Sequence, residues 1–202
     1  MLSEKFISAS RKFSTYKDHV AAPYFRKSFI IYSPPEKCTV TVTGLGFYDI
    51  YINGRKITKG ILAPYISNPD DIVYYDEYDI TEYVAEGKNV LGLHLGNGMQ
   101  NPLGGQIWDF DKASFRGAPR TAFCIEIFNS DGTVDKIEAD RTVKTAPSPV
   151  IFDDLRCGCF YDARKEIPDW SQVKYVDDFW NDAVIAETPR GEKRLCTAEP
   201  IA

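Results

Sequence analysis

The stretch Gly44-Leu-Gly-Phe-Tyr-Asp-Ile-Tyr-Ile-Asn-Gly-Arg-Lys-Ile57 decides the fold class of this chain. Every second residue in it is apolar at Tyr48, Ile50 and Ile52, and a period of two predicts a strand with one apolar face. Asn53-Gly54 then supplies two residues that adopt positive φ easily, as a tight hairpin turn requires. The stretch therefore predicts an antiparallel hairpin whose second strand starts at Arg55.

Segments of strand character lie on both sides of this hairpin. Cys38 to Thr43 alternates between threonine and other residues, and Asp131-Gly132 predicts a second hairpin. No segment repeats its apolar residues at the spacing of a long helix, although Asp79 to Gly87 has the pattern of one capped helical turn. We therefore predict an all-β fold, an antiparallel β-sandwich. The other predicted strands cover residues 23–32, 72–79, 89–95, 120–128, 134–139, 141–145 and 150–155.

The length and composition of the chain fit one domain. The 202 residues are 44% apolar, which is enough for one good-sized core. Residues 1–22 are polar, with weak helical character around Ser8 to Tyr16, and are predicted to form an amino-terminal extension. Residues 23–202 are predicted to form a single β-sandwich domain.

The charge pattern and the lengths of the apolar runs argue against nucleic acid and membranes as partners. Basic residues number 24 and acidic residues 29, and no cluster of Lys and Arg has the density of a nucleic-acid binding surface. No apolar run is long enough to span a membrane.

The amino terminus lacks the apolar segment of a secretory signal, and the five cysteines are an odd, scattered set that predicts reduced thiols. A cytoplasmic location is therefore expected.

Several motifs in order along the chain resemble a known family. They include Phe25-Arg-Lys-Ser-Phe29, the Gly44 to Gly54 hairpin, Leu95-Gly-Asn-Gly98 and Tyr161-Asp-Ala-Arg164. Together they resemble the amino-terminal β-sandwich domain of bacterial α-L-rhamnosidases, from about residue 23 onward. The resemblance implies a jelly roll of the galactose-binding type that precedes a separate catalytic barrel of paired helices. It also implies a carbohydrate-binding role, since some members bind L-rhamnose with calcium.

One position departs from the family pattern. The family usually has tryptophan directly after Leu-Gly-Asn-Gly, and this chain has Met99. A thioether is a poorer platform for the carbon face of a sugar than an indole ring.

Carboxylates are plentiful, but no pair is assigned as catalytic. Inverting glycosidases need two carboxylates placed on opposite sides of the scissile bond. The acidic residues here mostly come as neighbours, such as Asp76-Glu77 and Asp153-Asp154, and neighbours on a strand point to opposite faces. The resemblance implies that the catalytic carboxylates lie on the helical barrel. A glycosidase with an unrecognised site stays open as an alternative.

A sugar or calcium site is the better candidate. Calcium takes roughly six to eight oxygen ligands, and Asn and Asp side chains and carbonyls in the loops supply oxygens. The candidate carbohydrate-binding residues are Asn53, Asp70, Asp71, Asn97, Asn101 and Trp108. The candidate calcium ligands are Asn97, the carbonyl of Pro102 and Asp71, of which the resemblance implies Asn97 and Pro102 most directly. The alternative is that these residues only shape the turns.

The expected function is that of a non-catalytic accessory domain of an α-L-rhamnosidase-like glycoside hydrolase. It would pack on a catalytic domain of the same or a neighbouring polypeptide and bind a rhamnose-containing glycan. A purely structural β-sandwich module without a ligand is the alternative. An unpaired sheet edge could also pair with a second copy, which leaves a homodimer open.

Overall fold

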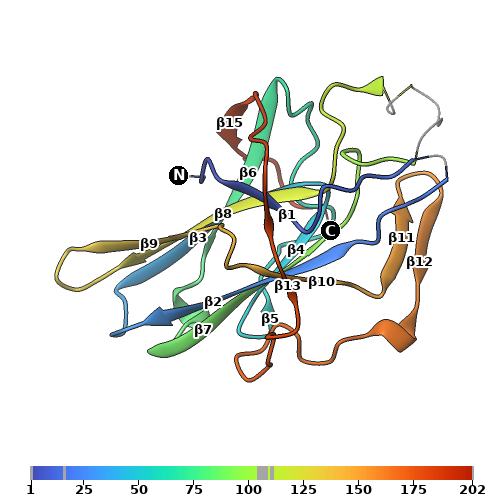
Figure 1. Ribbon diagram of the computed structural model, residues 1–202. Coiled ribbons are helices and arrows are strands. Elements are labelled where there is room, and N and C mark those ends of the chain that lie inside the picture. Colours follow the sequence, from blue (N-terminus) through green and yellow to red (C-terminus); the bar gives the residue numbers. More distant parts are fainter. Residues whose placement is uncertain (1, 16, 104–108, 110–111, 202) are drawn as a thin grey trace.

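The computed structural model describes residues 2–15, 17–103, 109 and 112–201, and its strands form two sheets packed face to face (Figure 1). The larger sheet has seven strands in the order β14-β1-β8-β3-β6-β15, and β9 pairs with β8 beside this path. Its strands are β1 (Phe6–Ser8), β3 (Lys37–Leu45), β6 (Ile72–Asp79), β8 (Arg120–Phe128), β9 (Val134–Glu138), β14 (Val184–Ala186) and β15 (Glu192–Leu195).

The smaller sheet has six strands in the order β13-β10-β2-β7-β4-β5. Its strands are β2 (Pro23–Ile31), β4 (Tyr48–Ile52), β5 (Arg55–Lys56), β7 (Gly87–Leu95), β10 (Lys144–Pro147) and β13 (Asn181–Asp182). A separate two-stranded ribbon consists of β11 (Val150–Asp154) and β12 (Gly158–Tyr161). In the described residues, no helix is long and apolar enough to cross a membrane.

The core lies between the two sheets and follows the alternation of the strands. On β3 the side chains of Cys38, Val40 and Val42 are fully buried in it, as are Leu91 and Leu93 of β7 on the facing sheet. Removing apolar surface from water is the main stabilising term in such a fold. The predicted all-β sandwich of jelly-roll type is confirmed. Its pairings are antiparallel except for that of β15 with β6, which is parallel.

The predicted hairpin between β4 and β5 is confirmed. Asn53 and Gly54 have φ of 51° and 85°, the positive values that the turn needs. The Asn53 side chain also joins the turn to its neighbours: its Oδ1 accepts from the Val90 amide at 2.8 Å and its Nδ2 donates to the Tyr83 carbonyl at 2.9 Å. The helical turn predicted between Asp79 and Gly87 is present as one turn of 3-10 helix, η1 (Thr81–Tyr83). It ends at Val84 rather than at Gly87, and its N-cap, Ile80, makes no side-chain capping bond, although the Asp79 carboxylate accepts from the Thr81 amide at 3.0 Å.

The amino-terminal residues are more ordered than their sequence suggests. Phe6 and Ile7 are fully buried, and β1 lies between β8 and β14 in the larger sheet. The helical character expected around Ser8 to Tyr16 is wrong, since the described residues there contain no helix. Pairing with β8 and burial of two large side chains outweigh a weak local preference for helix.

Residues 163–180 cover the outer face of the smaller sheet, and we call them the covering segment. It begins with a second 3-10 turn, η3 (Ala163–Lys165), and places Trp170 in a stack on Tyr24 of β2, with ring centroids 4.1 Å apart. Gly92 of β7 makes room for this ring, since a Cβ there would lie 2.8 Å from Trp170.

Arg26 of β2 holds the covering segment in place. Its side chain is fully buried and donates to the carbonyls of Trp170 and Gln172 at 2.9 Å and of Tyr175 at 3.0 Å. It also forms an ion pair with Asp177. A guanidinium has several donors in one plane, so a single side chain can satisfy all these acceptors.

Candidate functional site

Three loops meet at one end of the sandwich because the strands that carry them end or begin there. β3 ends at Leu45 and leads directly into β4, whose first residue, Tyr48, pairs with Leu95 at the end of β7. β6 runs antiparallel to β3 and begins at Ile72 on the same side. The loops around residues 44–47, 64–71 and 96–103 therefore gather there.

Glycines let two of these loops touch. Gly46 has a φ of 129°, and a Cβ on it would lie 2.0 Å from the carbonyl oxygen of Gly96. Any side chain at this position would force the loops apart. The glycines of the Gly44 to Gly46 and Gly96 to Gly98 motifs thus bring the backbones of the two loops together.

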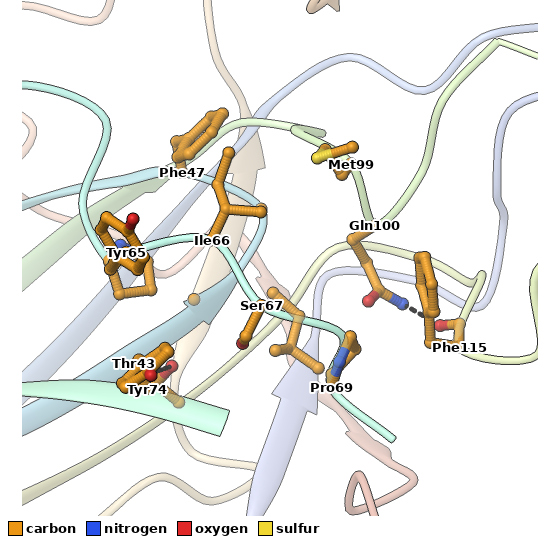
Figure 2. A pocket seen from close by; sticks show the side chains of 14 residues that line it. Thr43, Phe47, Tyr65, Ile66, Ser67, Pro69, Tyr74, Met99, Gln100 and Phe115 are labelled. Carbon is orange, nitrogen blue, oxygen red and sulfur yellow. Dashed lines mark hydrogen bonds between the residues drawn. The ribbon is translucent and has the colours of Figure 1, made fainter. Parts of the chain in front are cut away.

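The three loops enclose a hollow with a volume of about 50 Å³ (Figure 2). Aromatic and apolar side chains surround it, with Phe47, Ile66 and Met99 on one side of the view and Phe115 on another. The full lining is Thr43, Gly44, Leu45, Gly46, Phe47, Pro64, Tyr65, Ile66, Ser67, Pro69, Tyr74, Met99, Gln100 and Phe115.

Gln100 supplies the one buried polar group of this lining that lacks a hydrogen-bond partner among the described residues. Its side-chain nitrogen donates to the Phe115 carbonyl at 2.7 Å, which fixes the orientation of the amide. Its Oε1 is buried and has no partner among the described residues, and Figure 2 shows this oxygen on the side of the amide that points away from Phe115. A buried acceptor without a donor is costly, so this oxygen is suited to accept a hydrogen bond from a hydroxyl group that enters the hollow.

Asn97, a predicted ligand, points into the protein instead. It is 1% exposed, and its side-chain nitrogen donates to Asp153 at 2.6 Å and to the Val20 carbonyl at 2.8 Å. Its backbone amide donates to the same Asp153 carboxylate at 2.6 Å. Burial raises the pKa of Asp153, although its hydrogen bonds to Asn97 act in the opposite direction.

Asn101 continues this buried network. Its Nδ2 donates to Asn97 Oδ1 at 2.5 Å, and its Oδ1 accepts from the backbone amide of Ser14 at 2.6 Å. The structure therefore brings Asn97 and Asn101 into contact. Both side chains support the loop from behind and neither lines the hollow.

The residues predicted as calcium ligands make hydrogen bonds within the protein. The Pro102 carbonyl accepts from the Arg116 guanidinium at 3.3 Å, and Asp71 accepts from the Asn68 side chain at 2.9 Å. Among the described residues, no three side chains of His, Cys, Asp or Glu lie close enough together to hold a metal. The oxygens named from the sequence are therefore already used as hydrogen-bond acceptors.

The remaining predicted binding residues are dispersed. Asn53 lies at the opposite end of the sandwich, since it follows the end of β4 that pairs with the start of β7. Asp70 is at the same end as the hollow and accepts from the Ser114 hydroxyl. Trp108 lies outside the described residues.

The residues that line the hollow were largely missed in the sequence. Phe47, Tyr65, Tyr74, Gln100 and Phe115 come from separate segments, and no spacing links them. The two glycine motifs were the available signal, because close backbone contact at Gly46 and Gly96 determines which loops can enclose a space.

A larger groove of about 760 Å³ adjoins the hollow and shares Phe47, Pro64, Tyr65 and Ile66 with it. Asp76 also lines this groove and accepts from the Tyr48 hydroxyl at 2.5 Å. Burial raises the pKa of Asp76 and raises the pKa of Tyr48 well above its usual range. The Tyr48 bond uses this carboxylate internally, so we assign Asp76 a structural role.

The sequence model of the α-L-rhamnosidase N-terminal domain matches residues 33–202. An α-L-rhamnosidase of Formosa agariphila is 36% identical over 168 residues, which are 81% of this chain and 17% of that protein. The matched region thus spans about a sixth of the relative.

Solved structures of α-L-rhamnosidases contain a region with the same fold as this chain. The structure of α-L-rhamnosidase from Dictyoglumus thermophilum matches with a TM-score of 0.85 and 29% identity, over 97% of this chain and 22% of that one. The α-L-rhamnosidase of Streptomyces avermitilis complexed with L-rhamnose matches with a TM-score of 0.77 and 26% identity, over 85% of this chain and 16% of that one. The chain therefore belongs to the family of α-L-rhamnosidase N-terminal domains.

Proposed function

We propose that this chain is a non-catalytic domain of an α-L-rhamnosidase that packs on the catalytic domain and binds the end of a rhamnose-bearing glycan in the hollow beside Gln100. The observation that carries the glycan part is the Gln100 Oε1, a buried acceptor without a partner among the described residues, on a side chain that lines a hollow of mainly aromatic and apolar groups.

The hollow suits one edge of a deoxy sugar. L-rhamnose presents a methyl group beside hydroxyl groups, so one edge of its ring needs both apolar contact and a hydrogen-bond acceptor. Phe47, Tyr65 and Met99 offer the apolar contact, and Gln100 offers the acceptor. The volume of about 50 Å³ admits a part of one sugar ring, so the rest of the glycan would lie outside.

Packing on a catalytic domain is supported by the adjoining groove. Its rim carries side chains that are apolar and well exposed, among them Ile61 at 54%, Tyr65 at 59% and Ile66 at 48%. A cluster of exposed apolar side chains of this kind is typical of a surface that another domain covers.

Titration with L-rhamnose and with methyl α-L-rhamnoside, followed by amide chemical shifts, tests the glycan part. Wild type should show saturable shifts for residues 44–47, 64–69 and 99–101. Gln100→Met removes the acceptor at nearly constant volume, and one hydrogen bond of about 1 to 1.5 kcal/mol corresponds to about tenfold weaker binding.

Gln172→Met is the matched control, because Gln172 lies in the covering segment, far from the lining of the hollow. It should bind as wild type does. Absence of saturable shifts in wild type would favour the alternative of a purely structural module.

A further inference from the structure

We infer that the guanidinium of Arg116 takes the place that the family resemblance gives to calcium, so that this end of the domain is held closed by an internal cation and takes no metal. The inference is independent of glycan binding, because it concerns how the loops behind the hollow are held.

Arg116 joins the segment before β2 to the loop after β7. Its Nη2 donates to the Ser14 carbonyl and, at 3.3 Å, to the Pro102 carbonyl. Its Cζ also lies 5.0 Å from the centre of the Phe13 ring, within the range of a cation–π contact. A positive charge that binds two carbonyl oxygens from different loops performs the cross-linking that a bound metal ion would perform.

The Pro102 carbonyl is the decisive atom. It is one of the two ligands that the resemblance most directly assigns to calcium, and here it accepts from a guanidinium. A divalent cation on the same oxygen would lie within a few ångströms of that positive charge, where like charges repel strongly at a partly buried site.

The other assigned ligand is also engaged. Asn97 Oδ1 accepts from Asn101 at 2.5 Å, and Asn101 in turn accepts from the Ser14 amide. Both oxygens of Asp153, the carboxylate beside them, accept from Asn97. Calcium needs roughly six to eight oxygens around one point, and these oxygens are already used within a closed network.

Thermal unfolding of the 202-residue chain in EDTA and in millimolar CaCl₂ tests the inference, together with calorimetric titration of CaCl₂. We expect the same Tm in both buffers and no saturable heat. A saturable calcium signal with a Tm higher by about 5 °C or more would overturn the inference, and this measurement needs no variant.

Two variants test the role of the guanidinium. Arg116→Met keeps much of the side-chain volume and should lower Tm by about 5 °C in both buffers, a shift appropriate to the loss of charge-assisted hydrogen bonds in a domain of this size. Arg11→Met, at an exposed position in the segment before β2, should leave Tm near the wild-type value. Equal Tm for the two variants would refute the inference. Loss of rhamnose binding alone would not affect it, because these measurements contain no sugar.

Discussion

Replacing Arg26 should detach the covering segment and cost a large part of the stability of the domain. The side chain is fully buried, donates to three backbone carbonyls and pairs with Asp177, which is 20% exposed. Removing one partner of a buried ion pair costs about 3 to 5 kcal/mol, since the other partner keeps its charge without compensation. We take about 4 kcal/mol for Arg26→Ala.

Urea denaturation followed by tryptophan fluorescence measures this loss, because Trp170 and Trp180, both in the covering segment, pack against Tyr24 of β2. With an m value of about 2 kcal/mol/M, a loss of about 4 kcal/mol lowers the urea midpoint by about 2 M. Arg26→Lys should recover little, because an ammonium cannot reach three separated carbonyls at once.

Arg194→Ala is the control for Arg26. Arg194 pairs with Glu192 at 2.8 Å, but both side chains are about half exposed or more, so solvent screening should leave this pair a negligible contribution to stability. If Arg26→Ala lowered stability no more than Arg194→Ala does, the assignment of Arg26 as the residue that holds the covering segment would be refuted.

Two further predictions concern His94 and the apolar rim of the groove. Burial lowers the pKa of His94 to about 4, so between about pH 6.5 and 4 the unfolded chain binds a proton that the folded chain does not, and stability falls as the pH falls. Between pH 7 and pH 5, the free energy of unfolding measured by urea denaturation should therefore fall by about 2 kcal/mol less in His94→Gln than in wild type. Equal decreases in the two proteins would contradict this. In an α-L-rhamnosidase that carries this domain, Ile61→Asp should speed thermal inactivation several-fold, whereas Ile30→Asp, at an equally exposed isoleucine (54%) outside the groove, should not; equal inactivation rates would argue against this docking surface.

The parts of the fold that depend on local chemistry could be predicted from the sequence. Asn53-Gly54 forms the predicted turn because its φ preference is local, and the strand predicted over 72–79 has those same bounds in β6. The strand predicted over 141–145 instead begins at Lys144, because Asp140 and Thr142 form a turn before it. The family resemblance was also recognisable, because its motifs keep their order and spacing.

The parts that depend on distant partners could not be predicted. β14 has three residues and β15 has four, which is too short for a periodic pattern, and they form strands because β1 and β6 offer them edges. From the sequence, Arg26 is an ordinary polar position in a strand. Its burial is possible only because it donates to carbonyls about 145 residues later in the chain. At the site, the direction of the Asn97 and Asn101 side chains is set by Asp153 and Ser14, which no local pattern reveals.

The position of β1 has a consequence for synthesis of the protein. Among the strands described in this domain, β1 is synthesised before the others, yet its two neighbours are β8, more than 100 residues later, and β14, which begins at Val184. Until both have emerged, Phe6 and Ile7 have no sheet in which to be buried, and the nascent chain presents an unpaired apolar edge. Translation that stalls between β8 and β14 should therefore yield an aggregation-prone product.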